Sequence, residues 1–222
     1  MVRRRTAVSI AAAALLLASP ALTACGSGPD RTGSAAVVGD QKISVAALQS
    51  QVNAVRTAQT KSPQAAQLLS ESSTLSTQTL TMLVQDKVIS QALSDARLTV
   101  SNGEVQAARA QAVQQYGSEA ALDSDLLQNY GIAPSGIDSF LRTSLAAGKI
   151  TQSLGFQPGS DGGQTAIVGA IAKKANELGV HINPRYGSWD AKTAVIGAAK
   201  DPWLLNRTPT AAQAQAQAPQ GA

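Results

Sequence analysis

Very few side chains in this sequence could carry out covalent or metal chemistry. The 222 residues include a single cysteine, Cys25, and a single histidine, His181. A lone cysteine excludes an internal disulfide, and one cysteine with one histidine cannot form a Cys/His metal site. His181 lies in an alternating, strand-like run, where we expect it to face solvent or to be hydrogen-bonded within the sheet. The residue whose surroundings do predict chemistry is Cys25.

Three features before Cys25 together predict export and lipid attachment. Arginines at positions 3–5 are followed by an apolar stretch, 7–18. About a dozen apolar residues match a signal-peptide core and are too few to span a bilayer. The sequence Leu-Thr-Ala-Cys at positions 22–25 then resembles the bacterial lipobox, in which the cysteine thiol receives diacylglycerol. We predict a signal peptide over residues 1–24 and lipid attached to Cys25. The general secretory route is the favoured export route, and Arg4 and Arg5 leave twin-arginine export as the alternative.

Removal of the signal peptide would change the net charge of the chain and leave Cys25 at its N-terminus. The formal charge falls by three, from +4 to +1, because residues 1–24 carry three arginines and no acidic residue. A nearly neutral chain without a Lys/Arg cluster does not suggest a nucleic-acid binder. Residues 25–35, rich in Gly, Ser, Pro and Thr, are predicted to be a flexible tether with a root-mean-square span of roughly 18 Å. We therefore expect the protein on the extracytoplasmic face of the cell membrane, held by acyl chains such as palmitate on Cys25.

The remaining sequence, residues 36–206, predicts one mainly α-helical domain. Aromatic residues make up only 3% of the chain, and the abundant Ala, Leu, Val and Gln favour helices packed through aliphatic side chains. The longest helical pattern, 73–96, is apolar over a wide arc, so we expect it at the centre of the domain. Ser44 begins an earlier helix, and three more follow between residues 101 and 154. Each of these three is ended by Gly or begun by Ser or Pro, which is typical of a short-looped helical bundle.

Short β-prone stretches stand at both ends of these helices. Residues 36–43 predict two strands around a Gly-Asp turn. Residues 180–182 begin a late stretch that also contains Tyr186 and Trp189, two aromatics that we interpret as packing anchors. The chain ends in Ala/Gln/Pro repeats, residues 207–222, which are predicted to be disordered because they have little to bury.

Three parts of the sequence together resemble the SurA/PrsA-type periplasmic and surface chaperones. They are residues 37–44 (Val-Val-Gly-Asp-Gln-Lys-Ile-Ser), the central runs 83–105 and 116–120, and the closing run 180–190 with its Asn-Pro-Arg-Tyr-Gly motif. The resemblance covers residues 36–190, and the closing motif is its most specific part. It implies a mainly α fold, a helical bundle with a small β element formed by the N- and C-terminal parts of the domain. In this fold residues 180–182 would pair near residues 36–43.

The resemblance also implies a function, which is ATP-independent holding of unfolded secreted proteins without a cofactor or a metal. A helical cradle, lined by aliphatic side chains of the long helix and of residues 137–145, would shield apolar segments of these clients. The sequence predicts a late helix over residues 165–179. Family members with prolyl isomerase activity carry a parvulin domain between the early helices and this late helix. Here that interval is a linker, residues 155–164, far below the roughly 50 residues that a domain needs. We therefore expect no isomerase activity and no catalytic residue.

Other functions stay open from the sequence alone. The main alternative is a structural or assembly lipoprotein that binds one fixed protein partner. The chain has no phosphate-binding glycine loop and no nucleophile elbow, and Asp86, Asp95 and Asp138 lie at spacings typical of solvated helix faces. The sequence therefore nominates no acid/base pair, and a residual prolyl isomerase is the remaining enzymatic alternative. A solute-binding lipoprotein would show alternating strands and helices, which are missing here. The sequence does not determine the oligomeric state.

Overall fold

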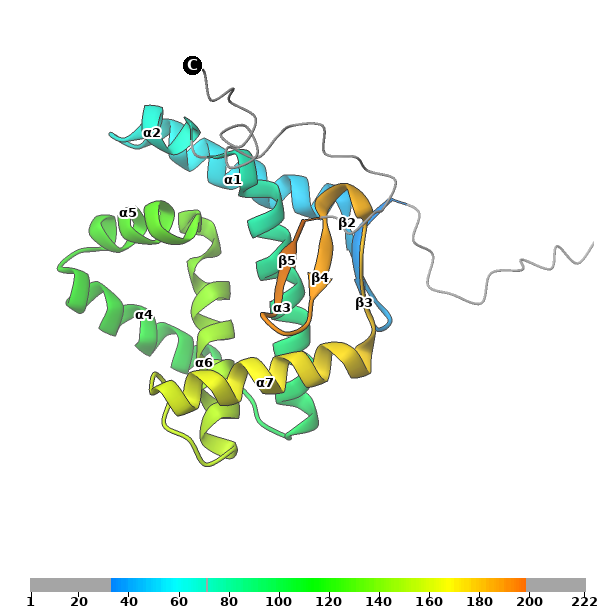
Figure 1. Ribbon diagram of the computed structural model, residues 1–222. Coiled ribbons are helices and arrows are strands. Elements are labelled where there is room, and N and C mark those ends of the chain that lie inside the picture. The colour runs from blue at the N-terminus through cyan, green and yellow to red at the C-terminus, as the bar shows by residue number, and fades with distance from the viewer. Residues whose placement is uncertain (1–32, 71, 199–222) are drawn as a thin grey trace, which may run out of the picture. The chain divides into compact units, whose positions relative to one another are not determined.

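Helices make up most of the described chain, which in this computed structural model comprises residues 33–70 and 72–198 (Figure 1). The α-helices are α1 (Val45–Lys61), α2 (Ala65–Ser70), α3 (Leu75–Asp95), α4 (Asn102–Tyr116), α5 (Glu119–Tyr130), α6 (Ile137–Ser153) and α7 (Asp161–Leu178). The strands are β1 (Ser34–Val38), β2 (Gln41–Ser44), β3 (Val180–Ile182), β4 (Ser188–Asp190) and β5 (Val195–Gly197). Short 3-10 turns are η1 (Ser72–Thr74), η2 (Pro134–Gly136) and η3 (Pro184–Tyr186). The predicted mainly α class with a small β element is confirmed.

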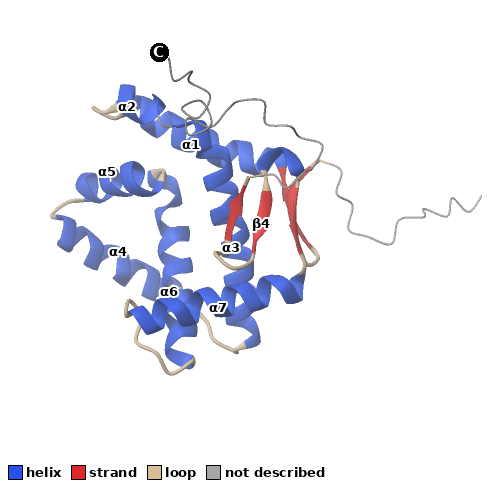
Figure 2. Ribbon diagram, viewed as in Figure 1, coloured by secondary structure: helices blue, strands red, loops and turns tan. Residues whose placement is uncertain are grey.

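Helix α3 is the centre of the fold, as its wide apolar arc predicted. It contacts α1, α6 and α7 as well as β1 and β5. Leu80, Val84 and Val88 all have 0% exposed surface. Residues four apart lie above one another on a helix, so these three form one continuous apolar face. Figure 2 shows the strands gathered on one side of this helix.

A three-stranded antiparallel sheet joins the two ends of the domain. Strand β1 is central and pairs with β2 on one side and with β3 on the other. Ala36 lies opposite Ile182, and Val37 lies opposite His181. The predicted pairing of the early and late segments is therefore confirmed. The turn between β1 and β2 contains Gly39 at a φ of +61°, a conformation that glycine adopts without steric cost.

The sheet begins earlier than the sequence predicted. Ser34 and Ala35, which we had placed in the tether, are buried residues of β1. Asn183 binds both of them: its backbone N–H donates to the Ala35 carbonyl at 2.9 Å, and its Nδ2 donates to the Ser34 carbonyl at 3.0 Å. Small residues that the sequence places in a tether are thus held in a strand from two sides, by β2 and by the hydrogen bonds from Asn183.

A second sheet, made of β4 and β5, was not predicted. The two strands pair antiparallel, with Trp189 opposite Ile196. Tyr186 and Trp189 are partly buried and pack against the main core, so their interpretation as packing anchors is confirmed. The hairpin is tight at its open end, since a Cβ on Gly187, just before β4, would lie 2.1 Å from the Gly197 carbonyl oxygen.

The loop between α6 and α7 is shorter than the predicted linker, residues 155–164. Helix α7 already begins at Asp161, and the Gly163 N–H donates to the Ser160 hydroxyl at 3.0 Å as an N-terminal cap. The glycine-rich sequence that suggested a linker is therefore the first turn of a helix. A Cβ on Gly163 would lie 2.2 Å from the Gln157 carbonyl oxygen, so glycine is required there by the close approach of the loop.

Alanine at Gly163 is expected to lower the free energy of unfolding by about 2 kcal/mol or more, because the loop backbone must move away from the new methyl group. Gly169 provides the matched control in the same helix, since nothing lies within 4 Å of a Cβ placed there. Gly169→Ala should raise stability by about 0.5–1 kcal/mol through helix propensity. Urea unfolding followed by circular dichroism compares the two variants. Equal stabilisation by both would show that the loop does not constrain position 163.

Candidate binding groove

A cavity of about 520 Å³ opens between α1, α3 and α6. Its apolar surface comes from these helices and from the segment after α5, and includes Val55, Leu83, Ile89, Ile132, Phe140 and Ala147. Hydroxyl-bearing side chains also line it, among them Ser50, Thr79, Ser135, Ser139, Thr143 and Ser144. The cavity therefore offers an apolar floor with hydrogen-bonding groups around it.

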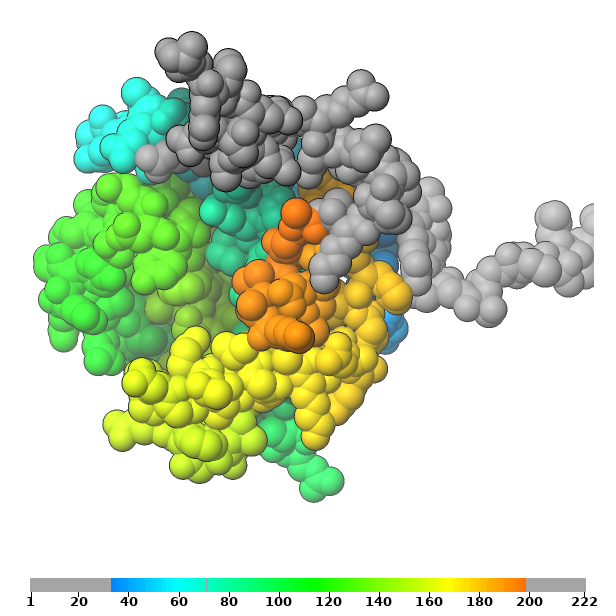
Figure 3. Space-filling model, in the orientation of Figure 1, coloured from blue at the N-terminus to red at the C-terminus, as the bar shows by residue number. Residues whose placement is uncertain are grey.

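A second cavity, of about 620 Å³, adjoins the first along α3. Met82 and Gly131 line both cavities. The second cavity extends toward β5, and Tyr130 and Val195 on its lining are 54% and 40% exposed. In Figure 3, α5 (green), α3 (teal) and the β4–β5 hairpin (orange) lie around this region. We refer to the two adjoining cavities together as the α3 groove.

The α3 groove lies beside two of the elements that the sequence predicted for a cradle, but its lining differs. Ile137, predicted to line it, is 0% exposed and belongs to a core cluster beneath α6. The α6 face that lines the cavity carries Phe140, Ser139 and Ser144 instead. Helix α1 and the segment after α5 also contribute, and the sequence analysis missed both. In the sequence, these two segments show only small residues beside an apolar stripe, and this pattern is too common to identify a groove.

Asp86 places a carboxylate in the groove wall between α3 and α6. The Thr143 hydroxyl donates to Asp86 Oδ1 at 2.7 Å, which fixes the orientation of the side chain. Among the described residues that line the two cavities, Asp86 is the one charged side chain. Its helical spacing predicted a solvated face, whereas the structure places it, partly buried, in the lining of a cavity.

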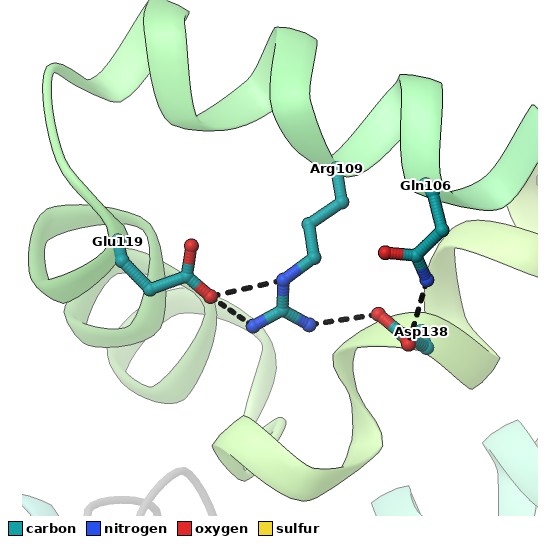
Figure 4. A network of polar contacts seen from close by, with 4 residues as sticks. All are labelled: Gln106, Arg109, Glu119 and Asp138. Carbon is teal, nitrogen blue, oxygen red and sulfur yellow. Dashed lines mark hydrogen bonds and ion pairs between the residues drawn. The ribbon is translucent and has the colours of Figure 1, made fainter.

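Asp138, in contrast, belongs to an ion-pair cluster that joins α4, α5 and α6 (Figure 4). The Arg109 guanidinium pairs with Glu119 and lies 2.7 Å from Asp138 Oδ1. Gln106 donates to the other oxygen of Asp138 at 3.2 Å. The hydrogen bond from Arg109 lowers the pKa of Asp138, so this carboxylate stays ionised and braces the helices.

Asp95 and Glu104 form further ion pairs between helices. Lys174 Nζ lies 2.8 Å from Asp95 Oδ2, and its hydrogen bond is the main cause of the lowered pKa of Asp95. Lys149 pairs with Glu104 and, together with the Ser101 backbone N–H, lowers the pKa of Glu104 to about 2. Both carboxylates are ionised at neutral pH and act as structural contacts.

His181 is exposed on β3, in agreement with the predicted solvent-facing position. It lines a separate cavity of about 430 Å³ together with Trp189, whose buried indole N–H has no hydrogen-bond partner among the residues that the structure describes. Within residues 33–70 and 72–198, no group of three or more His, Cys, Asp or Glu side chains could hold a metal ion.

The predicted lipid attachment site cannot be placed in the fold, because Cys25 lies outside the described residues. The signal peptide and the C-terminal repeats also lie outside them. Among the helices that the structure does describe, none is long and apolar enough to cross a bilayer.

Comparison with known proteins identifies the family. A family model described as the SurA-like N-terminal domain matches residues 1–151. The match takes in β1, β2 and the helices up to most of α6, and it ends before α7 and β3. No curated protein and no solved structure matches the chain. The resemblance found in the sequence is confirmed, and the chain belongs to the SurA-like N-terminal domain family, a family of the chaperone type that binds protein substrates.

Proposed function

We propose that this protein is a lipid-anchored chaperone that holds apolar segments of unfolded secreted proteins on the extracytoplasmic face of the cell membrane, without ATP. One observation carries the proposal: the α3 groove leaves apolar side chains accessible in a domain of the chaperone type. Monomeric proteins normally bury such surface or use it for binding. The anchor is supported by Cys25 and the signal-like sequence before it.

The chemistry of the groove suits many client sequences. Met82 lies where the two cavities adjoin, and an unbranched thioether side chain adapts its shape to different apolar partners. The hydroxyls of Ser139 and Ser144 can bond to a client backbone, which is the same in every sequence. Broad binding of moderate affinity is expected from a surface that combines adaptable apolar contacts with backbone hydrogen bonds.

We further propose that the protein has no prolyl isomerase activity. Helix α6 is followed by a short loop and then by α7, which begins at Asp161. A parvulin domain at this place would need roughly 50 residues or more. A client whose refolding is limited by proline isomerisation should therefore be held in solution and not accelerated.

Arginine at Ser144 is expected to remove most of the holding activity. Ser144 is exposed on α6 and lines the groove beside Thr143, the partner of Asp86. A guanidinium there would fill the cavity and compete with clients, and we expect at least about a tenfold loss of client affinity, or roughly 1.4 kcal/mol. The matched control is Ser153→Arg, because Ser153 is an exposed serine of the same helix, α6, that lines neither cavity.

Light scattering by several unrelated unfolded proteins, without ATP, measures how far each variant suppresses their aggregation. Wild type and Ser153→Arg should suppress the aggregation of all of them, and Ser144→Arg should not. Suppression for a single client would favour the alternative, an assembly lipoprotein with one fixed partner. Failure of the wild type with every client would refute the chaperone function.

A further inference from the structure

Asp86 differs from the other helical carboxylates described above because it has no cationic partner. Asp95, Asp138 and Glu104 each lie in an ion pair. Within the described chain, Asp86 accepts a single hydrogen bond, from Thr143 to Oδ1, and forms no ion pair. The side chain is also partly buried, at the wall of a cavity with an apolar floor. A carboxylate that has lost part of its water without gaining a cation is unfavourable, and binding of a cation would relieve this cost.

No described Lys or Arg lines either cavity of the α3 groove, so the groove carries one negative charge and nothing to balance it. We propose that Asp86 makes the groove selective for apolar segments that carry a nearby Lys or Arg, whose cation pairs with Asp86 Oδ2. This inference rests on the proposed function, since it takes the groove as the client-binding site. The partner class is an unfolded chain with an apolar run and a basic residue beside it.

The position of Asp86 along α3 also sets a spacing within the client. Leu75 lines the far cavity, Met82 lies where the cavities adjoin, and Asp86 lies in the near cavity. At 1.5 Å per residue, Leu75 and Asp86 are about 16 Å apart along the helix. An extended client covers this distance in about five residues, at roughly 3.3 Å each. The basic residue should therefore lie about five positions from the apolar side chain seated near Leu75, in either chain direction.

The pair should be stronger than an ordinary surface ion pair. The partly buried site excludes some water, which raises the Coulomb attraction. The bond from Thr143 already orders the carboxylate, so less side-chain entropy is lost when the cation arrives. We expect a client peptide with a correctly placed Lys to bind about tenfold more tightly than its neutral counterpart.

Fluorescence anisotropy with labelled peptides tests whether the groove prefers a basic residue at this spacing. The first peptide carries a leucine cluster and a Lys five positions away. In two further peptides this Lys is replaced by acetyl-lysine or by glutamate, and in a fourth the Lys stands at a different distance from the leucine cluster. The comparison of Lys with acetyl-lysine uses the wild-type protein and needs no variant. Asp86→Asn should remove the tenfold preference, so that the Lys and acetyl-lysine peptides bind this variant alike; a circular dichroism spectrum equal to that of the wild type shows that the variant is folded. Asp40→Asn, at the exposed turn between β1 and β2, changes the net charge equally and should keep the preference.

The possible outcomes distinguish the proposed role of Asp86 from the proposed chaperone function. Binding of no peptide by the wild type would refute the groove as the client site. Equal binding of the Lys and acetyl-lysine peptides would overturn the role of Asp86 and leave the chaperone function standing. A preference that survives in Asp86→Asn would also overturn it, because the charge responsible would then lie elsewhere.

Discussion

A chain that ends after Ser153 is expected not to fold, although the family match covers only residues 1–151. Strand β1 would lose β3, one of its two hydrogen-bonded neighbours. The main core would lose Ile167 and Ile171 of α7 and Ile196 of β5. Each buried aliphatic side chain contributes about 1.5–3 kcal/mol, so these three alone approach the total stability of about 5–15 kcal/mol of a typical domain.

Circular dichroism and thermal unfolding of the shortened chain provide the measurement. The control is a chain that ends after Ala198, which keeps every residue that the structure describes and should unfold cooperatively. A cooperative transition at the same temperature in the shorter chain would show that the first part of the domain is stable alone. It would also mean that α7 and β3 are additions to the fold and do not complete it.

Serine at Cys25 is expected to abolish stable membrane attachment and leave the protein as an unprocessed precursor or as a released form. Buried acyl chains contribute about 0.8 kcal/mol per methylene, so two or three of them hold a protein stably on a membrane. A hydroxyl cannot replace the thiol as the acceptor of diacylglycerol. The loss of membrane attachment should therefore be nearly complete. It should be a larger relative change than the loss of client affinity that we expect for the groove variants.

Membrane fractionation and the intact mass of the protein test the role of Cys25. Ser27→Ala, two positions further along, is the control and should remain lipidated and membrane-bound. Unchanged mass and unchanged membrane association in Cys25→Ser would refute lipid attachment at this residue. Loss of the lipid mass with retained membrane binding would point to a different anchor.

The helical part of the fold could be predicted because its boundaries are determined locally. Ser101 accepts from the Glu104 N–H, and Glu104 accepts from the Ser101 N–H, the capping box that the sequence pattern contains. Gly117 and Gly131 end α4 and α5 in the left-handed conformation that glycine favours. Each of these signals lies within one helical turn of the boundary that it marks.

Features that depend on distant residues could not be predicted in the same way. Ser34 and Ala35 lie in a strand that pairs with β2 and also binds the distant Asn183, and a loop carbonyl packs against Gly163 in the first turn of α7. The groove was missed in detail for a related reason, since apolar residues on α3 build both the core and the cavity. Asp86 could not be distinguished from solvated carboxylates, because helical spacing does not show which neighbouring helix faces it.

The central position of β1 has a mechanical consequence if the protein is anchored to the membrane through Cys25, as proposed. Any pull between the membrane and the folded domain reaches the domain first at Ser34, where β1 begins. Force along β1 would load its bonds to β2 and β3 in shear, so that the bonds on both sides resist together and do not open one after another. Strand β1, which joins the early and late parts of the domain, is therefore the element best placed to resist a force that a bound client exerts on the anchored protein.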